Sequence, residues 1–122
     1  MTVQDAIAQA DRLRPNTHEM EDKVAWLGAV ESNVVKHINL HEGYRIEYSP
    51  ITAADMNREL LITDEHVQVY VLYLIAMYDY YNGDIDRYNN GAQMFGNAME
   101  DWKAEYRRTH MPRRFEGSWN EV

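Results

Sequence analysis

The chain is 122 residues long, a length that suits one domain with a single modest hydrophobic core. Its lack of cysteine excludes a disulfide framework, a thiolate metal site and a cysteine nucleophile, and it fits a reducing cytosol. Twelve basic and twenty acidic side chains give a formal net charge of −8, which argues against a surface that grasps nucleic acid over the whole molecule.

A first helix is predicted for residues 2–13. Thr2 is a good N-cap with Asp5 three residues later, and Pro15 stops the helix. No basic segment followed by an apolar run opens the chain, so we expect no signal peptide.

A second helix is predicted to begin near Asn16 or Thr17. Apolar residues then recur at helical spacing through residues 20–38, and Trp26 widens the buried face. Gly28 lies inside this helix, where glycine costs about 1 kcal/mol relative to alanine. We therefore expect another part of the protein to pack closely at Gly28.

The pattern changes to a period of two after the second helix, within residues 39–63. Tyr44, Ile46 and Tyr48 alternate with polar residues. Residues 60–62 form a second apolar run, which either pairs with the first or packs on the helices. The sequence predicts an extended arm or small β element, steadied by the helices or by another chain, because an isolated hairpin is marginal in water.

A third helix, residues 67–81, is apolar on nearly every side. Thr63 or Asp64 can cap it, and only Gln68 and Asp79 within it are plainly polar. Its tyrosines and its length, below 18 apolar residues, argue against a membrane span. Such a helix is central in a core or lies between subunits. Because a chain this small can scarcely cover it completely, we expect surplus apolar surface and assembly with other chains.

The fourth helix is predicted to begin after an Asn-Gly break, with Asp84 as N-cap. An apolar seam with alternating spacings of three and four predicts antiparallel packing on the third helix; it consists of Ile85, Tyr88, Ala92, Phe95, Met99, Trp102 and Tyr106. Gly91 and Gly96 allow close backbone approach, and Pro112 ends the helix.

These elements predict a mainly α fold, a small bundle of about four helices with a central αα-hairpin and a short extended or β arm between the second and third helices. Residues 1–110 form one helical domain, and residues 111–122 form a flexible basic and aromatic tail. Residues 1–102 carry a net charge of −10, whereas residues 103–114 carry +4. This polarity favours docking on complementary surfaces, and cations at a helix C-terminus also complement the helix dipole.

The sequence predicts no enzyme and no cofactor. His37 and His41 have the spacing of two zinc ligands on a helix, but Ile38 occupies the position of the glutamate that zinc proteases require. Asn82, Asp84 and Asp86 imitate the start of a calcium loop, but the rest of that loop is absent. We therefore expect no metal site.

Two segments carry a resemblance to a known family. Residues 21–35, EDKVAWLGAVESNVV, resemble the early helix with a Trp-Leu core of head–tail connector proteins from long-tailed bacteriophages and prophages. Residues 66–112 resemble the C-terminal half of that family, in which a Tyr-rich helix leads through an Asn-Gly-Asp-Ile turn into a Tyr-Asn helix and ends in an aromatic, Arg and Pro segment.

The resemblance implies a structural protein of the virion neck that assembles in the bacterial host cytoplasm. Family members complete the head as a ring, typically of twelve copies, beneath the portal protein. The implied partners are portal protein, neighbouring copies, downstream neck or tail proteins, and genomic DNA in transient contact with the channel. The ring prolongs the DNA channel and offers the tail an attachment platform, and an acidic inner wall would repel phosphates and let DNA slide.

This interpretation assigns roles to three groups of residues. The residues assigned to packing in the hub, which the third and fourth helices form, are Tyr70, Tyr73, Leu74, Tyr78, Tyr81, Tyr88, Phe95, Met99 and Trp102. A subunit arm consists of Tyr44, Ile46 and Tyr48. Portal docking falls to Arg107, Arg108, Arg113, Arg114, Phe115 and Trp119. The alternative is a small cytosolic helical module that binds or regulates another protein, without catalysis, through a surface of tyrosine and methionine.

Overall fold

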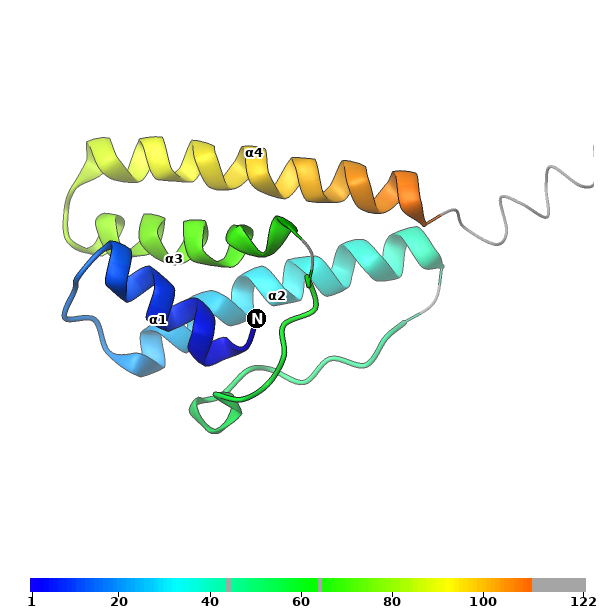
Figure 1. Ribbon diagram of the computed structural model, residues 1–122, viewed down its shortest axis with the longest axis horizontal. Coiled ribbons are helices and arrows are strands. Elements are labelled where there is room, and N and C mark those ends of the chain that lie inside the picture. The colour runs from blue at the N-terminus through cyan, green and yellow to red at the C-terminus, as the bar shows by residue number, and fades with distance from the viewer. Residues whose placement is uncertain (44, 64, 111–122) are drawn as a thin grey trace, which may run out of the picture.

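The computed structural model describes residues 1–43, 45–63 and 65–110. Within these ranges the chain forms four α-helices and no β-strand, which confirms the predicted small all-α bundle (Figure 1). The helices are α1 (Val3–Leu13), α2 (Met20–Glu42), α3 (Gln68–Tyr81) and α4 (Ile85–Thr109). Single 3₁₀ turns at Ala53–Asp55 and Glu65–Val67 interrupt the connection between α2 and α3.

Helix α1 begins as its sequence predicts. The Thr2 hydroxyl accepts a hydrogen bond from the Asp5 amide, and the Asp5 carboxylate accepts one from the Thr2 amide, each at 3.1 Å. This reciprocal cap satisfies two of the backbone N–H groups that a helix start leaves without partners.

Helix α2 begins at Met20, so the predicted start near Asn16 or Thr17 was wrong. The Asn16 side chain makes a local turn instead: it donates to the Arg14 carbonyl oxygen at 3.0 Å and accepts from the His18 amide at 3.1 Å. Asparagine competes with helical hydrogen bonding in this way. The competition delays the helix until the turn is complete.

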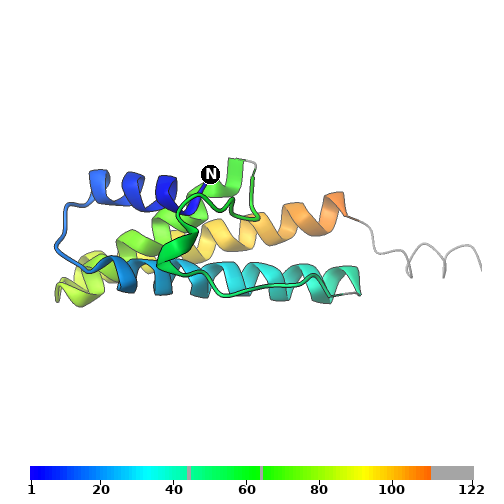
Figure 2. The same cartoon turned by 90° about the horizontal axis from the view of Figure 1, so that it is seen from below.

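Helix α3 lies at the centre of the bundle, between α4 on one side and α1 and α2 on the other (Figures 1 and 2). Val69, Tyr70, Leu74 and Tyr78 are fully buried on it. The α3–α4 connection is a tight turn in which Gly83 has a φ of 78°. Both the central position of α3 and the antiparallel αα-hairpin agree with the sequence prediction.

Glycine allows close approach at one of the two predicted places on α4. A Cβ at Gly91 would lie 3.5 Å from the Ala76 Cβ, so α3 and α4 approach closely there. A Cβ at Gly96 would meet no atom within 4 Å in the described structure. Gly96 therefore has no packing role of this kind.

The segment after α2 runs extended along that helix without forming a strand (Figure 1). The Ile46 amide donates to Asn39 Oδ1 at 2.8 Å, and the Tyr48 hydroxyl donates to the Gly28 carbonyl oxygen at 3.1 Å. A Cβ at Gly28 would lie 3.8 Å from the Tyr48 hydroxyl, an ordinary contact distance, so Tyr48 packs beside this position without requiring glycine there. Leu60 and Ile62 are buried in the core, so the second apolar run packs on the helices and does not pair with the first.

Candidate docking surfaces

Tyr70 belongs to a buried polar cluster that joins α3 to α2. Its hydroxyl donates to Glu31 Oε1 at 2.5 Å and accepts from the Ile62 amide at 3.1 Å, while Glu31 Oε2 accepts from the Leu61 amide at 2.8 Å. Burial raises the pKa of the Glu31 carboxyl, and burial together with the adjacent carboxylate raises the pKa of the Tyr70 hydroxyl. Tyr70 thus joins elements within one chain and has no surface for a partner.

Tyr78 has a similar internal role near the opposite end of α3. Its hydroxyl donates to Asp11 Oδ1 at 2.8 Å, and the buried Lys23 ammonium pairs with Asp11 Oδ2 at 3.0 Å. Burial alone would raise the pKa of Asp11, but hydrogen bonds from Asn16, Lys23 and Tyr78 outweigh burial and lower it. This network ties α1, α2 and α3 together.

The other predicted hub residues divide into interior and surface positions. Leu74, Met99 and Trp102 are buried within the chain, and Tyr73 packs against Phe95 with ring centroids 4.9 Å apart. Tyr88 is half-buried beside Tyr80, and Tyr81 is exposed. Much of the hub therefore packs inside one chain, and Tyr81 is the hub residue that most clearly faces outward.

One facet of α3 remains open between the end of α1 and helix α4. Leu72, Ile75 and Met94 line a groove of about 200 Å³ there, and Met94 is half exposed. At its edge the buried Asp79 carboxylate pairs with Arg14 at 3.2 Å. The chain covers α3 on most sides but leaves this facet only partly covered. The sequence analysis did not identify Met94 as a surface residue. The available signal was that Met94 lies outside the apolar seam by which α4 packs on α3.

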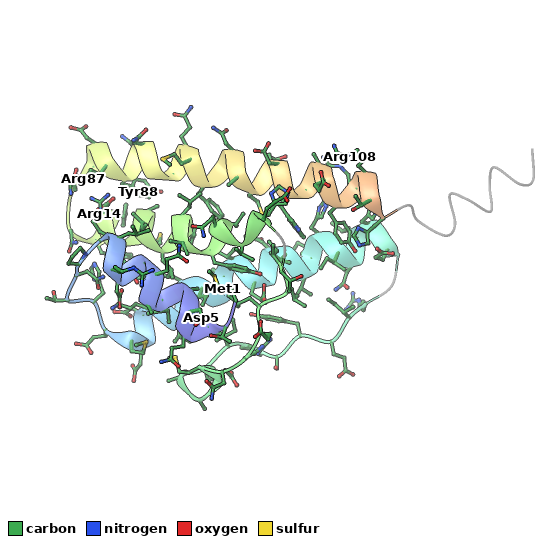
Figure 3. The ribbon with its side chains drawn as sticks, viewed as in Figure 1. Met1, Asp5, Arg14, Arg87, Tyr88 and Arg108 are labelled. Carbon is green, nitrogen blue, oxygen red and sulfur yellow. The ribbon has the colours of Figure 1, made fainter. Side chains whose placement is uncertain are left out.

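The two ends of the bundle differ in charge. Arg14, Arg87 and Tyr88 lie at the end formed by the α3–α4 turn, whereas Arg108 lies at the opposite end (Figure 3). Acidic residues open α2 and α4 at the first end, where Arg14 pairs with Asp79 and Arg87 pairs with Asp84.

The end with Arg108 is the basic one. Arg107 and Arg108 are exposed in the last turn of α4, and Arg108 forms an ion pair with Glu105. The Tyr106 hydroxyl donates to Glu42 Oε1 at 2.7 Å and so ties the end of α4 to the end of α2. Two of the predicted portal-docking cations are therefore accessible.

The remaining portal-docking residues, Arg113, Arg114, Phe115 and Trp119, lie outside the described residues, as does the whole predicted tail at 111–122. In the predicted subunit arm, Tyr44 lies outside the described residues too. Ile46 and Tyr48 contact their own α2, so the described part of the arm does not reach away from its chain.

His37 and His41 belong to an aromatic cluster between the ends of α2 and α4. The His37 ring lies 5.3 Å from the Trp102 ring and 6.4 Å from the His41 ring, centroid to centroid. Burial, followed by the nearby Lys103 and Arg107 charges, lowers the pKa of His37. Among the described residues, no group of three or more His, Asp or Glu side chains is placed to hold a metal ion.

Comparison with known proteins adds no further constraint: no family model, no curated protein and no solved structure matches this chain. In the described part of the chain, none of the helices combines the length and apolarity needed to cross a bilayer.

Proposed function

We propose that this protein is a head–tail connector of a long-tailed bacteriophage or prophage. In this role it forms a ring under the portal, extends the DNA channel and offers a platform to the tail. The observation that carries the proposal is the partly open facet of Leu72, Ile75 and Met94 at the α3–α4 hairpin. A groove of this kind gains stability when a neighbouring chain removes it from water.

The polarity of the bundle supports the same role. An adaptor must bind different partners at its two ends, and here one end opens α2 and α4 with acidic residues while Arg107 and Arg108 lie at the other. We assign portal docking to the basic end together with the tail residues Arg113, Arg114, Phe115 and Trp119. Acidic side chains would face the channel axis, and an inner wall of lysine and arginine would contradict this assignment.

Truncation tests the docking assignment. Deleting residues 111–122 removes two arginines and two large aromatic side chains, so binding to purified portal rings should weaken at least tenfold while the helical circular dichroism spectrum is retained. A full-length control with Glu116→Gln and Glu121→Gln should bind as the unchanged chain does. Equal portal binding by the truncated and full-length proteins would refute the assignment.

A second candidate function is a helical module that binds another protein and needs no portal. The extensive burial of α3 within its own chain favours it, because a well-covered bundle can act as a monomer. Such a module would stay monomeric or dimeric in the presence of portal rings, whereas a connector would add mass to them.

A further inference from the structure

The acidic end of the bundle carries an aromatic hollow. His18, Asp22, Trp26 and Tyr81 line an open depression of about 340 Å³. The Trp26 and Tyr81 rings stack with centroids 5.2 Å apart and an angle of 15° between their planes, and Tyr81 is 58% exposed. This hollow therefore offers a preformed aromatic wall beside the Asp22 carboxylate, and the first turn of α2 also carries Glu21.

The other end of α2 carries a feature of the opposite kind. Leu40 is 72% exposed, the largest exposed fraction among the large hydrophobic side chains that the structure describes as exposed. It borders a depression of about 620 Å³ together with Val35, Lys36 and Arg45, and the described lining of that depression includes no carboxylate. An apolar knob is thus flanked by two cations.

The knob and the hollow cannot meet within one chain. Both involve α2, and Asp22 and Leu40 are separated by about 27 Å along a straight helix at 1.5 Å per residue. The hollow lies at the end with the α3–α4 turn, and the knob lies near the opposite end of the bundle (Figure 1). Any contact between them must join two molecules.

We propose that the Leu40 knob of one copy docks in the aromatic hollow of a second copy. Leu40 would pack on Trp26 and Tyr81, while Lys36 and Arg45 would face the Asp22 carboxylate. Cations also bind favourably over the faces of Trp and Tyr rings. Each copy contributes one knob and one hollow, so the contact is head-to-tail and can repeat from copy to copy. In the proposed ring this contact would join neighbouring copies, and only that placement rests on the proposed function.

Two single variants test the contact through its head-to-tail nature. Leu40→Asp removes the knob and Tyr81→Ala removes one of the two stacked rings of the hollow; both positions are exposed, so the fold should be retained. At about 1 mM protein in low salt, where a contact with a millimolar Kd is substantially formed, the unchanged chain should form dimers and larger species by sedimentation equilibrium. Each variant alone should be monomeric.

An equimolar mixture of the two variants is the decisive sample. One intact knob and one intact hollow remain, so the mixture should form 1:1 dimers and nothing larger. Leu61→Asp is the matched control, because Leu61 is exposed away from both features, and it should associate as the unchanged chain does. Raising the salt to about 0.5 M should weaken the association of the unchanged chain at least threefold, since the ion pairs are exposed.

A monomeric unchanged chain at this concentration would overturn the proposal, and so would variants that associate normally or a mixture that stays monomeric. These outcomes are separable from the proposed function, because binding of the same variants to portal rings reports on the connector role independently. Portal binding without knob-and-hollow association would remove this contact and leave the connector role standing.

Discussion

At the scale of single residues, the buried Glu31 carboxyl links the stability of the protein to pH. It is fully buried, and it accepts hydrogen bonds from the Tyr70 hydroxyl and the Leu61 amide. These bonds fasten the connection before α3 onto α2. Burial is the dominant influence on this carboxyl, since it raises the pKa despite both hydrogen bonds and the Arg58 charge.

The raised pKa predicts how stability depends on pH. The folded protein holds the Glu31 proton at pH values where the unfolded chain, with a pKa near 4.5, has lost it. The contribution of Glu31 is therefore fully present below that value and is lost as pH rises through the folded pKa. Glu31→Gln cannot titrate, so the unchanged protein should lose stability relative to this variant as pH rises from about 4.5 through the folded pKa of Glu31.

Urea unfolding of both proteins across this range measures the difference. Groups common to both proteins, such as Asp11 with its lowered pKa, cancel in the comparison. A difference in unfolding free energy that is independent of pH, or that grows in favour of the unchanged protein as pH rises, would contradict the account of Glu31.

At the scale of the elements, residue types predicted a helix start correctly where a nearby side chain caps the helix. The Thr2–Asp5 cap and the Asp84 cap both form as their residue types indicate. The start of α2 was missed because the Asn16 side chain closes a turn, an outcome that helical spacing alone does not reveal. The arm shows the same limit: alternation predicted extended backbone, but tertiary packing of Leu60 and Ile62 decided that no strand pair forms.

Substitution by alanine should change the stability of the protein in opposite directions at two glycines of the α3–α4 hairpin. Gly96 lies inside α4 with open space at its Cβ position, so Gly96→Ala should stabilise the protein by about 0.5–1 kcal/mol. Gly83 has a positive φ in the α3–α4 turn, so Gly83→Ala should destabilise it by about 1 kcal/mol. Thermal or chemical unfolding measures both changes. Loss of stability in the Gly96→Ala variant would show that α4 packs differently.

At the scale of the whole molecule, the sequence could predict which residues are charged but not which surfaces they build. Exposure of Arg107 and Arg108 follows from their place at the end of a helix. The hollow does not, because it brings His18 from a loop, Trp26 from α2 and Tyr81 from α3 together through tertiary packing. The apolar surplus predicted for α3 is reduced in the folded chain, since α1, α2 and α4 cover much of the helix. The exposed Tyr80 and Tyr81 and the facet at Leu72 and Ile75 remain.

That facet leads to the most direct test of the connector account. The chain is mixed with purified portal rings and the product is imaged by electron cryomicroscopy. We predict added ring density beneath the portal, with the groove of Leu72, Ile75 and Met94 covered by an adjoining chain. Portal rings without added density, while the chain stays free in solution, would contradict the account.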